Sequence, residues 1–248
     1  MLRSIDSLKG YRLAAADGDI GHCRDFLFDD RDRAIRYMVA DTGGWLSSRK
    51  VLISPLALLE PDWETRRFPV ALTREEIERS PPLDAHAPVS REYEIAYHRH
   101  FALPFYWTGA ELWGSYADPR GVVHPVPTET QQPLEDIEVE EGHLRSCAEV
   151  EDYSIRANDG ETEKIRDFIV DDSNWAIRFV VVDTRRWLPG GQVLVPAQQI
   201  EWIDWTEREV KCGLDVGQIK DSPPYDPAQP VNAEYERRLY DYYGRPRR

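Results

Sequence analysis

The sequence predicts a mainly β protein made of two similar domains in tandem. Three observations lead to this prediction. The chain repeats itself without a gap at an offset of 142 residues, which places Leu2 on Leu144. Each copy holds several short apolar runs, and turn-forming residues separate those runs. A period of this length marks a domain-sized unit, because solenoid repeats are several times shorter.

The repeat extends from Leu2 to Glu94 in the first copy and from Leu144 to Glu236 in the second. Its clearest matches pair Tyr11 with Tyr153, Asp17-Gly18 with Asp159-Gly160, Arg24-Asp25-Phe26 with Arg166-Asp167-Phe168, Asp29-Asp30 with Asp171-Asp172, and Trp45-Leu46 with Trp187-Leu188. The sequence therefore predicts a first domain over 1–100, an aromatic segment and acidic linker over 101–142, and a second domain over 143–248.

Six short runs in the first copy predict strands, with a hairpin turn at Asp17-Gly18 between the first two. The runs cover 11–15, 22–28, 35–40, 50–53, 56–60 and 66–71, and clear counterparts lie at 177–182, 192–195, 200–205 and 207–212. The run 177–182 is apolar enough for a strand that is covered on both sides. Six strands at this spacing indicate a small closed barrel or a sandwich.

Helices are predicted after the strands of each copy. Thr73 and Glu76 have the spacing of a capping box, and Ser80-Pro81-Pro82 would end that short helix. Ser90 can cap a helix that extends to His100, and 234–243 is its counterpart in the second copy.

The order of these residues resembles the PRC-barrel family. The resemblance lies in the Asp-Gly turn, the Arg-Asp-Phe and Asp-Asp positions, the Trp-Leu pair, and Val-Leu followed by a proline. The family is named for the cytoplasmic domain of the photosynthetic reaction centre H subunit, and it includes the C-terminal half of the ribosome maturation factor RimM. The resemblance implies two six-stranded β-barrels, each followed by short helices. It implies an adaptor or assembly role and no shared catalytic residues.

Composition limits the function classes. The formal net charge of −14 disfavours nucleic acid as a partner, because an acidic surface repels phosphate backbones. The three cysteines, Cys23, Cys147 and Cys212, have no Cys-x-x-Cys spacing, which fits a reducing compartment. We find neither a signal peptide pattern nor an apolar run of about 18 residues, and so expect a cytoplasmic protein without membrane insertion.

Titratable residues offer few candidates for chemistry. His98 and His100 could form a metal pair, but two-residue spacing on a helix points their rings apart. The carboxylate pairs Asp29-Asp30 and Asp171-Asp172 could hold a divalent cation, although adjacent carboxylates in a turn are usually turn formers. We therefore expect no metal, no cofactor and no catalytic residues.

Two further sets of residues are candidates for structure or binding. Arg36 with Asp41 and Arg178 with Asp183 recur in both copies, and we expect ion pairs or a repeated ligand site there. The segment 101–113 could clamp the two domains together or offer an aromatic patch to a partner. The predicted interaction surface comprises Phe105, Tyr106, Trp107, Trp113, Trp45 and Trp187.

The sequence thus predicts a non-catalytic adaptor or assembly protein that associates with an unknown protein partner or with itself, as a homodimer. An alternative from another class is a small-molecule- or metal-binding protein or enzyme with a site between the two barrels. Association with RNA or the ribosome is a third interpretation, which the acidic charge disfavours.

Overall fold

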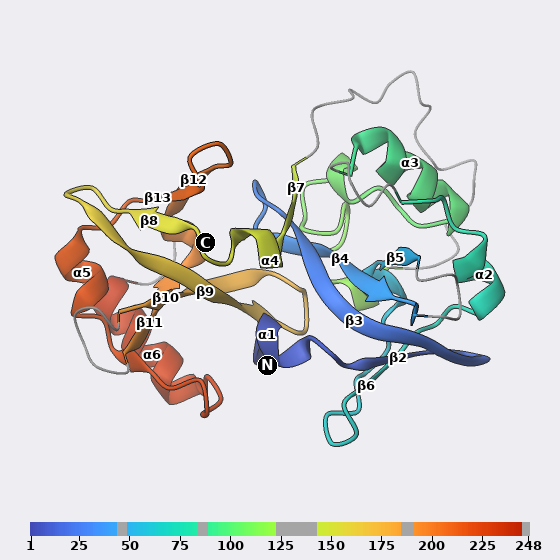
Figure 1. The fold of residues 1–248 in the computed structure, drawn as a ribbon, viewed down its shortest axis with the longest axis horizontal. Coiled ribbons are helices and arrows are strands. Elements are labelled where there is room, and N and C mark those ends of the chain that lie inside the picture. Colours follow the sequence, from blue (N-terminus) through green and yellow to red (C-terminus); the bar gives the residue numbers. More distant parts are fainter. Residues whose placement is uncertain (44–48, 84–88, 123–142, 185–190, 245–248) are drawn as a thin grey trace. The chain divides into compact units, whose positions relative to one another are not determined.

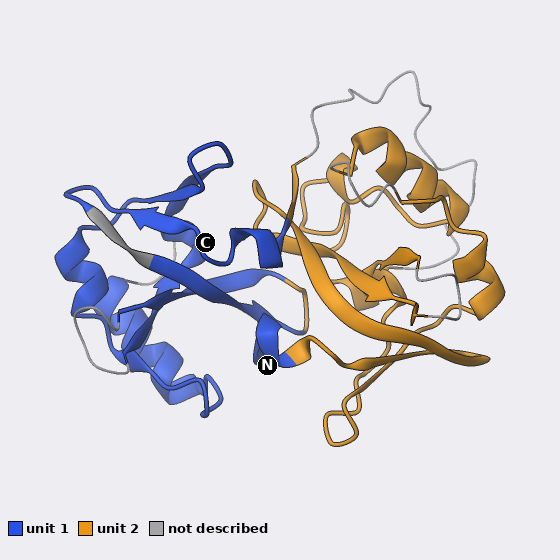
Figure 2. Ribbon diagram, viewed as in Figure 1, with its two compact units in different colours: residues 1–7, 146–172, 176–248 blue, residues 8–145, 173–175 orange. Residues whose placement is uncertain are grey.

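The computed structural model describes the chain except for residues 44–48, 84–88, 123–142, 185–190 and 245–248 (Figure 1). The described part is mainly β, as the sequence predicts, and contains two multi-stranded sheets. The chain divides into two compact units (Figure 2). Unit 1 comprises 1–7, 146–172 and 176–248, and unit 2 comprises 8–145 and 173–175.

Unit 2 contains most of the first copy. Its sheet has the strand order β5-β4-β3-β2-β6, and β7 pairs with β3. Its elements are β2 (Arg12–Ala15), β3 (Gly18–Asp29), β4 (Ala34–Asp41), β5 (Lys50–Ile53), β6 (Arg67–Pro69), α2 (Arg74–Glu78), α3 (Arg91–His100) and β7 (Leu144–Ser146).

Unit 1 contains most of the second copy. Its sheet has the order β12-β13-β8-β9-β10-β11-β14, and β1 pairs with β9. Its elements are β1 (Leu2–Ser4), α1 (Ile5–Leu8), α4 (Cys147–Val150), β8 (Ser154–Arg156), β9 (Glu161–Asp171), β10 (Ile177–Asp183), β11 (Gln192–Pro196), β12 (Ile200–Asp204), β13 (Glu209–Cys212), α5 (Val216–Lys220), β14 (Pro224–Tyr225) and α6 (Ala233–Tyr243).

The first strand of each copy is exchanged. Strand β1 begins the first copy but lies on β9 of the second, with Leu2 opposite Asp171. Strand β7 begins the second copy but lies on β3 of the first. The turn residues 173–175 likewise belong to unit 2, where the backbone N–H of Ile35 donates to the Trp175 carbonyl at 2.8 Å. The compact units therefore cut the chain differently from the domain boundaries that the repeat suggested.

Local chemistry explains where the helices begin. The Thr73 hydroxyl accepts from the backbone N–H of Glu76, and the Glu76 carboxylate accepts from that of Thr73, which completes the predicted capping box. Ser90 accepts from the N–H of Tyr93 at the start of α3, and Asn232 accepts from that of Tyr235 at the start of α6. Each cap satisfies a backbone donor that the first helical turn leaves free.

The predicted strands are found with one exception. Residues 56–60 lie partly in a short 3-10 turn (Pro55–Ala57), where the Ser54 hydroxyl accepts from the N–H of Leu56. The counterpart 200–205 forms β12 as predicted. In the described part of the chain neither sheet closes into a barrel, because the two strands at its ends do not pair with each other. Within the same part, none of the helices has the length and apolar character needed to cross a membrane.

Candidate functional site

Helix α3 buries a polar face in unit 2. Arg91, Glu94 and His98 follow one another at three- and four-residue spacing, so they lie on one side of the helix. Glu94 is 0% exposed and His98 is 1% exposed. Buried charges are costly unless they are paired, so this face requires partners from neighbouring elements.

Glu94 is the centre of that cluster. Its Oε1 accepts from the Tyr106 hydroxyl at 2.6 Å and lies 3.1 Å from the Tyr37 hydroxyl oxygen. Arg91 Nη1 lies 2.9 Å from its Oε2. Burial raises the pKa of Glu94 to about 7, although Arg91 and the two hydroxyl groups oppose the shift. The site therefore favours a protonated carboxyl group more than water does.

His98 continues the chain of hydrogen bonds. Its Nδ1 lies 2.6 Å from the Pro104 carbonyl, which can only accept, so Nδ1 carries a proton. Burial lowers the pKa of His98 to about 3, and the neutral ring then accepts at Nε2 from Tyr37, 2.8 Å away. With the Tyr37 proton directed to His98, a protonated Glu94 can donate to the Tyr37 oxygen. The neutral forms of Glu94 and His98 therefore both have hydrogen-bond partners.

The segment 101–113 covers this cluster. Arg36, on β4, donates to the Leu112 carbonyl at 2.5 Å, and its guanidinium lies 3.9 Å from the ring centroid of Tyr106 and 5.3 Å from that of Trp113. The Arg91 guanidinium lies 4.1 Å from the ring centroid of Trp107. Cation–π and hydrogen-bond contacts thus hold the aromatic segment over the polar face.

The second copy keeps an arginine at the position of Arg36, and we call these two residues the anchor arginines. In the second copy the anchor arginine is less buried. Arg178 is the counterpart of Arg36 and donates to the Tyr240 hydroxyl at 2.6 Å, with Glu236 3.6 Å away. Glu236 and Tyr240 stand in the places of Glu94 and His98. The side chains of Arg178 and Glu236 are 30% and 27% exposed, whereas that of Arg36 is 0% exposed. We call Arg178, Glu236 and Tyr240 the α6 surface.

The structure shows where the predicted aromatic residues lie. Phe105, Tyr106 and Trp113 are buried inside unit 2, and Trp107 is half-buried. Trp113 donates from Nε1 to the Asn174 carbonyl at 2.8 Å, which ties the segment to the turn 173–175 of the same unit. These side chains thus form interior packing in unit 2, while Trp45 and Trp187 lie outside the described residues.

The predicted ion pairs are wrong in their partners. Arg36 reaches Asp32 at 2.6 Å instead of Asp41, whose carboxylate accepts from the N–H of Gly43. Arg178 contacts Tyr240 and Glu236, while Asp183 pairs with Arg166 at 3.0 Å. The physical reason is the strand period, because residues five apart on a strand point to opposite faces.

The carboxylate pairs have a structural role that sequence reasoning missed. Asp30 pairs with Arg145 of β7 at 3.2 Å, and Asp172 pairs with Arg3 of β1 at 3.1 Å. Both carboxylates sit in turns, as expected, but each also fastens the exchanged first strand of the other copy. The repeat could have indicated this role, because Arg3 aligns with Arg145 and Asp30 aligns with Asp172.

One acidic group could geometrically hold a cation. Ligand oxygens of Asp6, Glu151 and Asp167 lie within 4.8 Å of one another in unit 1. Asp167 already accepts from the Ser4 hydroxyl and from the N–H groups of Asp6 and Phe168, and burial raises its pKa to about 6. These bonds fix the exchanged segment to β9 and use both carboxylate oxygens of Asp167.

His98 and His100 do not form a metal pair in the structure. His98 bonds to Tyr37 and Pro104, whereas the His100 ring lies 3.2 Å from the Glu76 carbonyl. The two rings face different elements, as their helical spacing predicts.

No protein-family model matches the chain, and no curated protein matches it either.

Proposed function

We propose that the chain is a non-catalytic association module of the PRC-barrel type, in which the α6 surface of unit 1 binds an aromatic-rich segment of a protein partner. The partner segment would supply what residues 101–113 supply in unit 2. Aromatic rings would lie against Arg178, and a backbone carbonyl would accept from its guanidinium.

The observation that carries the proposal is the difference between the two copies at equivalent positions. In the first copy the anchor arginine is covered by an aromatic segment, and its side chain is fully buried. In the second copy the anchor, the acidic residue and the helix are retained, but they are partly open to solvent. The second copy thus keeps the arginine but leaves it partly exposed. This favours binding of another aromatic segment with the chemistry of the one that covers Arg36.

The exchange of first strands supports the same function class. Each sheet accepts a strand from outside its own copy, and this is the mode by which many sheets bind extended segments. An enzymatic function has less support in the described residues. Glu94 and His98, which have the chemistry of an acid and a base, are buried and bonded to one another through Tyr37.

The test uses a synthetic peptide of residues 101–113 as the probe, titrated against the full chain and followed by fluorescence anisotropy. We expect saturable binding that Arg178→Ala weakens by about tenfold, because the variant removes both the donor and the cation. Arg238→Ala is the matched control, since Arg238 lies on the exposed side of α6. A peptide with alanine at Tyr106, Trp107 and Trp113 should not bind.

Two outcomes would refute the proposal. The first is a lack of saturable binding by the peptide, and the second is an equal loss of affinity in Arg178→Ala and Arg238→Ala. A thermal-shift screen with divalent metals and metabolites tests the enzyme alternative, because a ligand that binds only the folded chain raises its melting temperature. Light scattering over a range of concentrations decides whether a second copy serves as the partner.

A further inference from the structure

A row of basic side chains crosses three neighbouring strands of unit 2. Arg12 on β2 lies directly opposite His22 on β3 and directly opposite Arg67 on β6. Residues in such register share one face of a sheet, and two arginines side by side repel each other. The row therefore favours an anion close to the two guanidinium groups.

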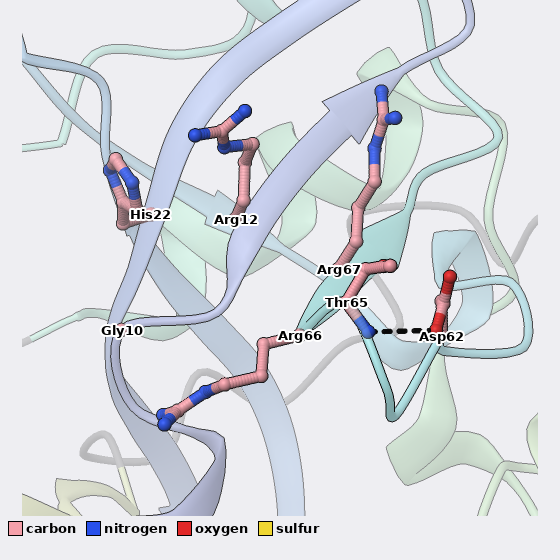
Figure 3. A pocket seen from close by; sticks show the side chains of 7 residues that line it. All are labelled: Gly10, Arg12, His22, Asp62, Thr65, Arg66 and Arg67. Carbon is pink, nitrogen blue, oxygen red and sulfur yellow. Dashed lines mark hydrogen bonds between the residues drawn. The ribbon is translucent and has the colours of Figure 1, made fainter.

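This row borders an open pocket of about 500 Å³, which lies within unit 2 (Figure 3). Figure 3 shows Arg12 and Arg67 extending to the same side, while Arg66 points away from them. Arg66 donates to the Lys9 carbonyl at 3.2 Å, with its guanidinium 5.1 Å from the centroid of the Tyr11 ring. The lining residues are Gly10, Arg12, His22, Asp62, Thr65, Arg66 and Arg67.

The carboxylate of Asp19 lies beside both arginines of the row. One carboxylate oxygen of Asp19 lies 3.6 Å from Arg12 Nη1, and the other lies 3.3 Å from Arg67 Nη2. All three side chains are about half exposed, at 60% for Arg12, 49% for Arg67 and 52% for Asp19. Such exposed pairs are weak, so Asp19 leaves most of the donor capacity of both guanidinium groups available.

The second copy lacks both arginines of this row although it keeps the surrounding structure. Its equivalent positions are Lys164, Ser154 and Glu209, in the same register across β9, β8 and β13. Glu209 is neutralised there by Arg156 at 2.9 Å.

The turn beside the row is the same in both copies. Asp62 and Asp204 accept from the two corresponding N–H groups of the turn, and Arg66 and Arg208 have φ of 54° and 53°. The fold therefore forms without the basic row, which points to a role in binding.

We propose that this pocket binds the phosphate group of a small phosphorylated molecule, beside Asp19 and across Arg12 and Arg67. Guanidinium groups match the oxygens of phosphate, and donors from two strands suit a dianion with several oxygens. The pocket volume lies in the range of small-molecule sites. Extended polyanions fit less well, because the net charge of −14 repels them at longer range. This proposal is independent of the peptide-binding function above.

The first experiment is a calorimetric titration of the full chain with inorganic pyrophosphate at constant ionic strength. We expect one saturable site, and we expect Arg12→Ser with Arg67→Ser to raise its Kd by at least about tenfold. The matched control is Arg79→Ser with Arg120→Ser, which removes the same charge from two exposed positions of unit 2. Each variant is first checked for an unchanged melting temperature.

Asp19→Asn provides a test in the opposite direction. It removes the competing carboxylate and should lower the Kd by about two- to fivefold. Glu78→Gln, an exposed residue of α2, should leave the Kd unchanged.

Two further probes separate the ligand classes. Vesicles of phosphatidylcholine with phosphatidic acid test a lipid headgroup, and citrate tests a carboxylate. Binding of pyrophosphate alone supports the proposal. Binding of vesicles but not pyrophosphate would overturn it, as would citrate of equal affinity, equal losses in the two double variants, or the absence of saturable binding.

Discussion

At the residue scale, Glu94 should make stability depend on pH. Burial raises its pKa from 4.5 to about 7, so between these values the folded chain holds a proton that the unfolded chain has lost. Raising the pH through this window therefore lowers the free energy of unfolding. We expect wild type to lose about 2–3 kcal/mol relative to Glu94→Gln between pH 5 and pH 8. Urea unfolding at both pH values measures this difference.

The comparison with Glu94→Gln is needed because His98 acts in the opposite direction. The pKa of His98 is lowered from 6.5 to about 3, so in that window the unfolded chain binds the extra proton and stability increases with pH. The two effects partly cancel in the wild-type curve, and the variant removes only one of them. Glu236→Gln, at the half-exposed counterpart, is the control. Parallel curves for wild type and Glu94→Gln would contradict the prediction.

Single residues also mark where sequence reasoning failed. The repeat correctly showed that Arg36 and Arg178 are special, because they are retained in both copies. Their partners could not be inferred from proximity along the chain. Arg36 contacts the Leu112 carbonyl and the Tyr106 ring, which lie in a segment outside the repeat. Only the tertiary structure brings that segment to β4.

At the element scale, the exchanged strands should be fastened by their matched ion pairs. Arg145 and Asp30 are only 21% and 18% exposed, in contrast to Arg79 and Glu75 on α2, at 71% and 66%. A double-mutant cycle to alanine should give a coupling of about 1 kcal/mol for the first pair and about 0.3 kcal/mol for the second. Equal couplings, measured by urea unfolding, would show that Arg145 contributes nothing specific to the exchange.

The turn between β9 and β10 should stabilise unit 2. Trp175 is buried there, with ring centroids 6.0 Å from Phe26 and 6.5 Å from Phe68, while its counterpart in the first copy is Arg33. Truncation of a buried tryptophan leaves a cavity, so Trp175→Ala should cost about 3–5 kcal/mol. Trp202→Ala is the control because Trp202 is 48% exposed. Similar urea midpoints for the two variants would refute the role of Trp175.

The elements that the sequence predicted are those with a strong local signal. Periodic apolar runs predicted β3, β4 and their counterparts, and capping residues predicted α2 and α3. The three-residue strands β1 and β7 were missed, since Leu-Arg-Ser is too short to show a period. Residues 56–60 were assigned to a strand wrongly, because Pro55 and the Ser54 hydroxyl instead favour a 3-10 turn.

At the scale of the whole molecule, the repeat predicted two similar bodies but not how the chain is divided between them. By its place in the repeat, Leu2 belongs to the first copy. Its strand, however, pairs with β9 in the sheet of the second copy. Exchange leaves the sequence pattern unchanged, because each strand has an equivalent environment in either sheet. The closed barrels implied by the family resemblance remain a proposal, since the described strand paths are open.

The exchange predicts that the two copies stay together after the chain is cut between them. A protease site inserted within 123–142 would give an N-terminal fragment that supplies 1–7 to unit 1 and a C-terminal fragment that supplies 143–145 and 173–175 to unit 2. Neither fragment contains a complete unit, so we expect both to elute as one species after cleavage under native conditions. Lowering the stability of both exchanged strands with Arg3→Ala and Arg145→Ala should promote dissociation on dilution, which light scattering can follow. Two separate fragments that each melt at the temperature of the uncut protein would mean that each copy folds with its own first strand.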